Sequence, residues 1–331
     1  MIAGIAVSLA CLYFATKGTD WAHVGTVLAG ARPLWIVAVM LASVATVYIR
    51  AQRWRVLLRP LGEVPLYPAL SATAIGFGAS SVLPFRLGEL LRPALLGRRA
   101  GVGMSAALSS VVLERLFDVL LVIACFLAVS LIYPEVPEEM RRGAFALAAL
   151  ALVGFVVLVA MQRHRVRTEA LLARVLRRLP DRLANRLRPL VASFMSGLGG
   201  LADLPTVLLV LWYSAYLWGM ITLTFLFAFL ALDTHVPLVA ASLTTVVVVA
   251  AAVFLPQAPG FVGTWQAGCV LALGLFKVSQ EVAVGYSLLT WIVQMAVNIA
   301  TAGVFLARED LSLRQLLHVA ERETPAADLG G

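Results

Sequence analysis

The stretch Leu83-Pro84-Phe85-Arg86-Leu87-Gly88-Glu89 interrupts an apolar run at a point where a membrane helix would simply continue. The stretch Leu255-Pro256-Gln257-Ala258-Pro259-Gly260-Phe261-Val262-Gly263 interrupts a second run in the same way. Each break begins at a Leu-Pro pair, and proline lacks the N–H that a continuing helix needs. Broken hydrophobic segments in corresponding halves of a membrane chain indicate the binding site of a transporter.

The composition places both breaks in a membrane protein. The chain has 331 residues, of which 61% are hydrophobic and only 13% are charged. Repeated apolar stretches of nearly 20 residues require a bilayer. We therefore predict an all-α polytopic membrane protein with about six full transmembrane helices and two re-entrant broken hairpins. The six spans are expected at 1–16, which is short, and at 33–49, 105–132, 143–161, 206–231 and 281–307.

The net charge of +8 does not indicate nucleic-acid binding, because the basic residues lie between the apolar runs. The positive-inside rule explains this pattern and places the arginine-rich segment 163–188 in the cytoplasm. The basic blocks 50–66 and 92–104 then also face the cytoplasm, so the hairpin at about 67–91 enters and leaves on one side. The same count places both chain termini in the cytoplasm, in the cytoplasmic (inner) membrane of a cell.

Continuing the count gives the second half the opposite orientation. Asp233 and His235 face the outside, as does the segment 277–281, so 236–276 is a hairpin entered from outside. The two halves therefore form an inverted-topology repeat. The predicted organisation is a first membrane half at 1–165, an amphipathic cytoplasmic linker at 166–200, a second half at 201–308 and a cytoplasmic tail at 309–331.

The linker 166–200 alternates leucines with arginines and is interrupted at Pro180. This pattern predicts two amphipathic helices. They lie either on the anionic inner leaflet or, as we prefer, between the two halves as a coupling element.

Non-helical backbone at membrane depth must be buried in protein or line a wet cavity. The residues of the two breaks are therefore predicted to form the backbone of an internal cavity: Pro84, Gly88, Pro259, Gly260 and Gly263. The alternative is that these prolines and glycines only shape turns near the surface.

Charged residues accompany the first break. Arg86, Glu89 and Arg92 are spaced by three, which places them on one helix face. Glu114, Arg115 and Asp118 lie inside the predicted span 105–132, where an unpaired charge costs about 3 kcal/mol or more. We expect one buried network in which Arg86 or Arg115 bridges Glu114 and Asp118. These last three charges are equally explained by a structural lock, so Arg86 and Glu89 are the better functional candidates.

The second half is neutral around its break, which Gln257, Thr264 and Gln266 flank. Thr290, Gln294 and Asn298 recur every four residues along the last predicted span. Hydrogen bonding between helices is the favoured interpretation of this stripe. The alternative is that Gln294 and Asn298 line the same cavity as Glu89.

Other polar and aromatic residues carry less signal. The aromatic residues Trp212, Tyr213, Tyr216 and Trp218 are expected to be interfacial or packing residues. The three cysteines lie in apolar runs, where cysteine behaves as a small hydrophobe, so we expect neither a disulfide nor a metal site.

Four motifs follow one another in this chain: Arg50-x-x-Arg53-Trp54, Leu83-Pro84-x-Arg86-x-Gly88-Glu89-x-x-Arg92, Glu114-Arg115-x-x-Asp118 and Pro259-Gly260-x-x-Gly263. Their order and spacing resemble the membrane domain of lysylphosphatidylglycerol synthases and its stand-alone flippase-like relatives. The resemblance implies a bacterial or archaeal membrane protein that moves or houses polar lipids. It implies headgroup-binding or cavity roles for Arg53, Arg86, Glu89, Arg92, Glu114, Arg115 and Asp118, to which the neutral residues Gln266, Gln294 and Asn298 are added.

The chain departs from the family pattern at two places, since Gln266 and Trp291 stand where the family commonly has a glutamate and, nearby, an arginine. This departure puts a lysine-bearing headgroup in doubt. About 24 residues follow the last predicted span, so we expect no aminoacyl-transfer domain.

The sequence thus favours a flippase-like transporter that moves a polar phospholipid between the leaflets of the cytoplasmic membrane, without a cofactor. Two alternatives stay open. One is a membrane enzyme that transfers a group on a phospholipid or a polyprenyl-phosphate lipid, and the other is a scaffold for lipid synthesis. Membrane lipids are the expected partners, and a second copy of the chain and a lipid-synthesis enzyme stay open as protein partners.

Overall fold

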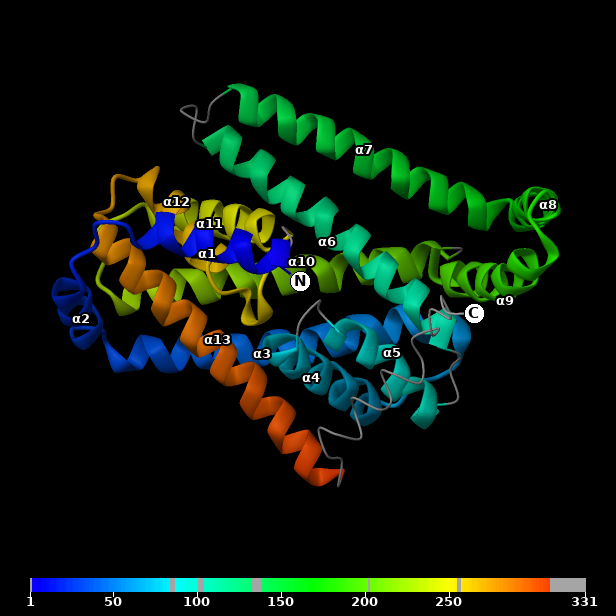
Figure 1. Ribbon diagram of the computed structural model, residues 1–331, viewed down its shortest axis with the longest axis horizontal. Coiled ribbons are helices and arrows are strands. Elements are labelled where there is room, and N and C mark those ends of the chain that lie inside the picture. Colours follow the sequence, from blue (N-terminus) through cyan, green and yellow to red (C-terminus); the bar gives the residue numbers. More distant parts are fainter. Residues whose placement is uncertain are drawn as a thin grey trace.

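The computed structural model describes residues 2–83, 87–100, 104–132, 138–201, 203–254 and 257–309, and within these ranges it contains helices and no strand (Figure 1). This confirms the predicted all-α class. The α-helices are α1 (Ile2–Thr16), α2 (Trp21–Ala29), α3 (Pro33–Leu58), α4 (Leu66–Val82), α5 (Leu87–Ala100), α6 (Met104–Ile132), α7 (Glu138–Arg163), α8 (Arg165–Leu176), α9 (Asp181–Gly197), α10 (Leu204–Ala231), α11 (Leu238–Val253), α12 (Thr264–Gly274) and α13 (Gln280–Arg308). Short 3₁₀ turns are η1 (Arg59–Leu61), η3 (Leu198–Leu201) and η4 (Pro259–Phe261).

Among the described residues, three helices are long and apolar enough to cross a membrane: α3 continued through η1, α10 and α13. A fourth candidate is the pair α7–α8, which is bent by 100°. Helix length and composition therefore support three or four spans of the six predicted. The helix α6 has 29 residues, about 43 Å, but carries three charges in its middle. The helix α1 has 15 residues, fewer than the roughly 20 that a span needs.

Two pairs of short helices occupy the positions of the predicted hairpins. The first pair, α4 and α5, has 17 and 14 residues, and the second, α11 and α12, has 16 and 11. Each helix is shorter than a full span. Between α11 and α12 the chain turns at Gly260 and Gly263, whose φ angles of 69° and 84° suit glycine. The residues 84–86 and 255–256, which include Pro84 and Arg86, lie outside the described ranges.

The tips of the two hairpins meet. A Cβ atom at Gly260 would lie 3.1 Å from the backbone oxygen of Ser81, near the end of α4. The hairpins therefore approach one another inside the bundle, on the side of α4 that also faces α13.

The helices α3 and α10 run antiparallel and pack along one another (Figure 1). The N–H of Arg32, just before α3, donates to the oxygen of Ala231 at the end of α10, at 2.8 Å. The largest core cluster joins α10 to α11, α12 and α13. Its centre is the stacked pair Phe229 and Tyr286, with ring centroids 4.3 Å apart, and the Tyr286 hydroxyl donates to the oxygen of Phe225 at 2.8 Å.

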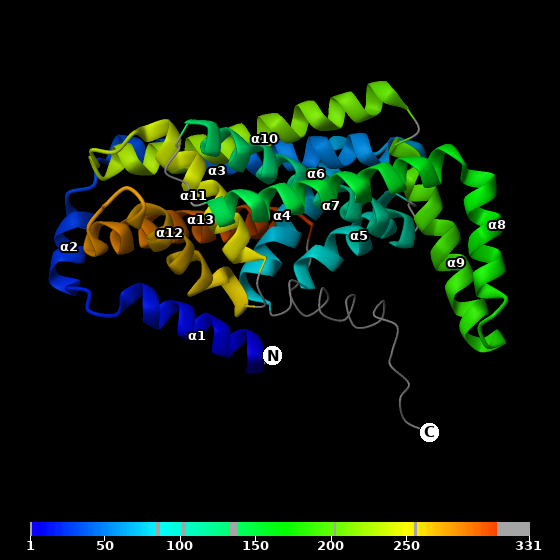
Figure 2. The same cartoon turned by 90° about the horizontal axis from the view of Figure 1, so that it is seen from above.

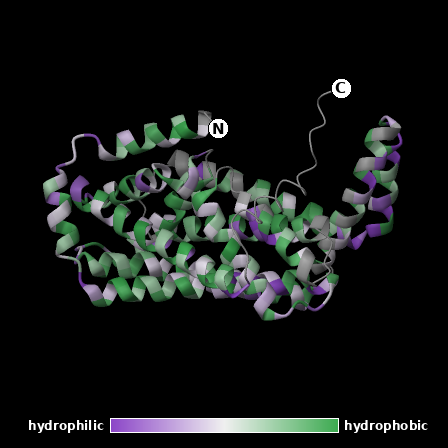
Figure 3. Cartoon of the chain, turned by 60° about the horizontal axis from the view of Figure 1, so that its bottom comes forward, coloured by the Kyte–Doolittle hydropathy of each residue, from purple (hydrophilic) through white to green (hydrophobic). Residues whose placement is uncertain are grey.

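The helices α8 and α9 project from one end of the bundle as a separate arm (Figure 2). The chain turns by 100° between α7 and α8, so the arm lies across the direction of the long helices. Many residues of this arm are coloured as hydrophilic in Figure 3. The predicted amphipathic pair of helices broken at Pro180 is therefore present, since α9 begins at Asp181.

A substitution at Gly88 tests the close contact of α4 with α5. A Cβ atom there would lie 2.0 Å from the oxygen of Gly76 and 2.4 Å from the nitrogen of Ser80, so no side chain fits without moving the backbone. We expect Gly88→Val to destabilise the protein by about 3 kcal/mol, the upper end for overpacking. Thermal unfolding in detergent measures this loss. Gly154→Val on α7 is the control, because nothing lies within 4 Å of a Cβ there. Equal losses in both variants would contradict the contact.

Candidate functional site

The guanidinium of Arg53 lies between two carboxylates of α6. Its Nη1 is 2.6 Å from Asp118 Oδ1, and its Nη2 is 3.5 Å from Glu114 Oε1. The same Nη1 donates to the Ser214 hydroxyl of α10 at 3.2 Å. Since Glu114 and Asp118 are an i, i+4 like-charge pair, the arginine between them removes a repulsion that burial would strengthen.

Arg92 of α5 completes this buried cluster. Its Nη1 is 2.9 Å from Glu114 Oε2, and its guanidinium lies 4.5 Å from the ring centre of Trp54. The Trp54 Nε1 in turn donates to the Ser110 hydroxyl at 2.8 Å. Four charged residues are therefore almost fully buried, and their formal charges sum to zero: Arg53, Arg92, Glu114 and Asp118.

The predicted network of charges exists, but its bridging residue differs from the prediction. Arg53 bridges Glu114 and Asp118, whereas Arg115 pairs with Asp118, at 3.6 Å, but does not bridge these two carboxylates. Arg86 lies outside the described residues. The physical reason is that α3 packs beside both α6 and α10, so Arg53 approaches from across the helix interface, while Arg115 is attached to α6 itself.

A second ion pair lies beside this cluster and is only partly buried. Arg115 Nη2 is 3.2 Å from Glu89 Oε1, and these side chains are 29% and 23% exposed. The residual exposure distinguishes the pair from the sealed cluster, because its atoms are open to an adjoining cavity.

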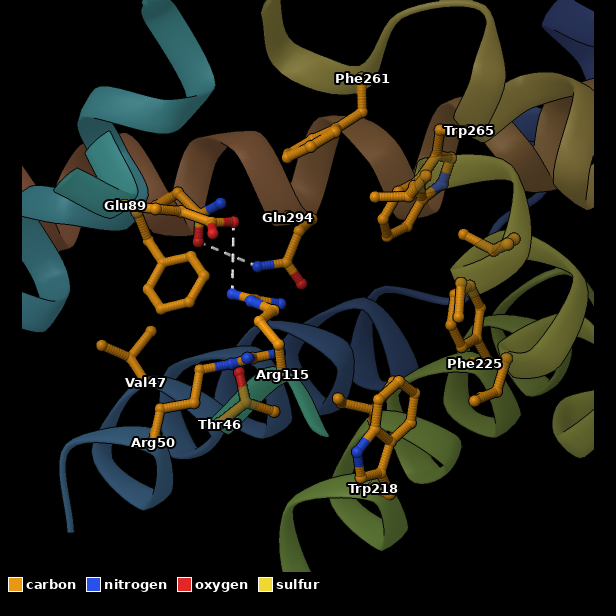
Figure 4. A pocket seen from close by; sticks show the side chains of 17 residues that line it. Thr46, Val47, Arg50, Glu89, Arg115, Trp218, Phe225, Phe261, Trp265 and Gln294 are labelled. Atoms are coloured by element: carbon orange, nitrogen blue, oxygen red, sulfur yellow. Dashed lines mark hydrogen bonds and ion pairs between the residues drawn. The ribbon is translucent and has the colours of Figure 1, made fainter. Parts of the chain in front are cut away.

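That cavity has a volume of about 180 Å³ and receives residues from both halves of the chain (Figure 4). Arg50 and Arg115 reach it from α3 and α6, and Glu89 reaches it from α5. Aromatic side chains form much of its wall: Phe77, Trp218, Phe225, Phe261 and Trp265. The result is a small space with two guanidiniums and one carboxylate against largely apolar walls.

Gln294 and Asn298 of α13 line the same cavity as Glu89, as the alternative interpretation of the polar stripe proposed. They also hydrogen-bond, since Gln294 Nε2 donates to Asn298 Oδ1 at 3.0 Å. Asn298 Nδ2 then donates to the Ser81 hydroxyl of α4 at 3.2 Å. The third member of the stripe, Thr290, accepts a hydrogen bond from Trp265 Nε1 at 3.1 Å. The stripe therefore serves both of the roles considered for it.

Gln266 lies away from this cavity. Its Oε1 accepts a hydrogen bond from the N–H of Gly263 at 2.7 Å, at the beginning of α12. Gly263 itself presses against α1, because a Cβ there would lie 2.0 Å from the oxygen of Ser8. In the structure Gln266 therefore caps α12 and Gly263 packs against α1, and a cavity role for these two residues stays a prediction.

Gly88, Pro259 and Gly260 are also not among the residues that line this cavity. Gly88 lies at the close contact between α4 and α5, and Pro259 is exposed. The oxygen of Gly260 accepts a hydrogen bond from Trp291 Nε1 at 2.6 Å. Glycines at the breaks allow backbones to approach closely, and the neighbouring Phe261 supplies the wall instead.

Several cavity residues were not predicted from the sequence, among them Arg50 and Trp218. Arg50 lies 4.8 Å from the ring centre of Phe77 and faces the cavity, and its spacing of three from Arg53 was the available signal. Trp218 was expected to be an interfacial or packing residue. It lines the cavity and donates from Nε1 to Asp118 Oδ1 at 3.2 Å, thereby joining the cavity to the buried cluster.

The arrangement suits an anion better than a metal ion. Arg50 and Arg115 outnumber Glu89, and guanidinium forks match the oxygens of phosphate or carboxylate. In the part of the chain that the structure describes, no three His, Cys, Asp or Glu side chains form a group that could hold a metal.

Removing Arg53 should be far more costly than removing an exposed arginine. Arg53→Met leaves Glu114 and Asp118 buried with one partner fewer, and we expect a loss of about 3–5 kcal/mol in unfolding free energy. Arg32→Met is the matched control, because its 2.7 Å ion pair with Asp233 is more than half exposed and such pairs contribute about 1 kcal/mol or less. Adding Asp118→Asn to Arg53→Met should recover part of the loss in thermal unfolding. Failure of that rescue would show that Arg53 acts through packing alone.

Comparison with protein families gives one match, which covers most of the chain. Residues 1–302 match the lysylphosphatidylglycerol synthase TM region. No curated protein sequence matches the chain. The matched range contains the buried cluster and every cavity residue named above. It confirms the resemblance found in the four motifs: the chain belongs to the family of the lysylphosphatidylglycerol synthase transmembrane region.

Proposed function

We propose that this protein moves a polar phospholipid between the two leaflets of the cytoplasmic membrane. Family membership ties the chain to lipid synthesis or translocation in a membrane. The observation that carries the proposal is the central cavity, where Arg50 and Arg115 face a largely apolar interior between the two halves. A cationic site inside an apolar enclosure suits the phosphate of a lipid headgroup.

Glu89 gives this site a way to bind and release its cargo. In the structure Glu89 holds Arg115 at 3.2 Å. A phosphate that enters the cavity competes with Glu89 for the same guanidinium. Because Arg115 has an anionic partner both before and after this exchange, the guanidinium is not left unpaired at membrane depth. The headgroup therefore binds without the full free-energy cost of leaving a buried arginine unpaired.

The proposed transport mechanism is alternating access within an inverted repeat. Support comes from the helix contacts, which correspond if α3 is matched with α10, α4–α5 with α11–α12, and α6 with α13. The helix α4 packs on α13, and its counterpart α11 packs on α6. The helix α3 packs on α4 and α13, as α10 packs on α11 and α6. Such repeats hold their substrate where the halves meet.

The headgroup role of the two arginines is tested by lipid exchange between leaflets. Liposomes containing the purified protein and a fluorescent phosphatidylglycerol are treated with a membrane-impermeant quencher. We expect Arg50→Gln and Arg115→Gln each to slow exchange about tenfold or more, since a charged hydrogen bond contributes about 1.5–3 kcal/mol. Arg59→Gln is the control, because Arg59 is exposed on η1 and does not line the cavity.

Two results would contradict the proposal. Exchange that is equal in all four proteins would remove the headgroup role of Arg50 and Arg115. No exchange by the folded wild-type protein would favour the scaffold, and conversion of the lipid to a new product would favour the membrane enzyme.

The proposed orientation places the arm α8–α9 and both termini in the cytoplasm, because the arm is rich in arginine. In a cysteine-free background, Glu63→Cys and Gly97→Cys then flank the first hairpin on one side. Both should react with a membrane-impermeant maleimide only from the cytoplasmic side, and His235→Cys only from outside. Reaction of positions 63 and 97 from opposite sides would make the first hairpin a full span and would end the inverted repeat.

A further inference from the structure

An apolar groove of about 200 Å³ lies between α4, α5 and α13. The described residues that line it are all apolar, and small ones among them are Gly78, Ala79, Ala302 and Gly303. Nothing lies within 4 Å of a Cβ atom at Gly303, so the groove is open beside α13. The groove is distinct from the central cavity, because no described residue lines both.

The groove and the cavity lie on either side of the same two helices. On α4, Phe77 lines the cavity and Gly78 lines the groove. On α13, Asn298 lines the cavity and Ile299 lines the groove. A thin boundary between α4 and α13 therefore separates the polar space from the apolar one, and we refer to it as the seam.

The seam is held by small residues and by a hydrogen bond between side chains of α4 and α13. The bond joins Asn298 Nδ2 to the Ser81 hydroxyl at 3.2 Å. Below it, Gly78 and Ala302 touch so closely that a Cβ at Gly78 would lie 2.2 Å from that of Ala302. Asn298 also accepts from Gln294, which faces the cavity. A ligand that accepts a hydrogen bond from the Gln294 amide therefore competes with Asn298 for that donor. The side chain of Asn298 in turn bonds to Ser81 at the seam.

We infer that the groove is the acyl-chain slot of the lipid whose headgroup enters the central cavity, and that the seam is the portal between them. The inference rests on the proposed function. A lipid has a polar headgroup joined to apolar chains, and the two neighbouring spaces have these two chemistries. The substrate class is thus a phosphate-bearing lipid that enters sideways between α4 and α13 with a chain in the groove.

The apolar lining of the groove favours a hydrocarbon chain as its occupant. Such a chain requires no hydrogen-bond partner along its length. Because bilayer lipid is as apolar as the groove, an acyl chain gains little affinity by entering the groove. Its position there mainly directs the lipid toward the portal.

Gly303 provides the test. Gly303→Leu fills the groove without a clash, and Gly219→Leu on α10 is the matched control, because nothing lies within 4 Å of a Cβ there either. The detergent-solubilised protein receives one equivalent of phosphatidylglycerol that carries a photoreactive diazirine near the end of one acyl chain. After illumination, the labelled peptides are mapped by mass spectrometry.

We expect adducts on α4 and α13 in the wild-type protein and in Gly219→Leu. In Gly303→Leu their yield should fall about fivefold or more, the equivalent of 1 kcal/mol of overpacking. Val82→Trp, which fills the groove from α4, is the second variant and should give the same loss if Gly303→Leu does not fold.

Adducts spread equally over all apolar helices would overturn the slot. So would unchanged labelling in Gly303→Leu together with a change of oligomeric size, which would make the groove an interface between copies. The proposed function has a separate test. If groove labelling depends on Gly303 but the protein exchanges no lipid between leaflets in liposomes, the acyl-chain slot is supported and the transporter function is rejected.

Discussion

The arrangement of the first half depends on the guanidinium of Arg53 and its two carboxylate partners on α6. Glu114 and Asp118 are one turn apart, and each would be costly to bury alone. Arg53 satisfies both from α3, while Ser214 and Trp218 of α10 supply further hydrogen bonds to the same group of atoms. These ion pairs and hydrogen bonds all form only when α3, α6 and α10 are together. Burial of these residues therefore selects one packing of three helices, because other packings leave a charge without a partner.

Arg92 extends this constraint to the first hairpin. Its ion pair with Glu114 attaches α5 to α6, and its contact with the Trp54 ring attaches α5 to α3. The second hairpin is held by neutral contacts instead, among them the cap from Gln266 to Gly263 and the bond from Trp291 to Gly260. The two halves thus solve the same problem, a broken helix inside the bundle, by different chemistry. The charged half leaves Glu89 and Arg115 beside the cavity, and the neutral half contributes amides and aromatic rings.

Much of the site followed from residue spacing. The three-residue spacing of Glu89 and Arg92, and the charges inside α6, predicted a buried network, and the four motifs predicted the family that the comparison confirmed. The partners within the network could not be predicted, because the distance from Arg53 to Asp118 is set by the packing of α3 on α6. The cavity role of Trp218 was missed for the same reason. In the sequence it is one of several aromatic residues near a membrane interface, and only its neighbours on α6 distinguish it.

The amino-acid sequence by itself determined the helical class, the membrane environment, the two interrupted segments and the residues that carry charge into the bundle. These are local properties, since hydropathy, proline positions and charge spacing act within one helix or one turn. The tertiary structure decided which arginine bridges the carboxylates, that the glycines of the breaks allow helices to pack closely, and that Gln294 and Asn298 join Glu89 around one space. It also decided that an apolar groove lies one residue away from that space. Each of these depends on which helices become neighbours, and that choice is made by the summed burial and charge pairing of residues far apart in the chain.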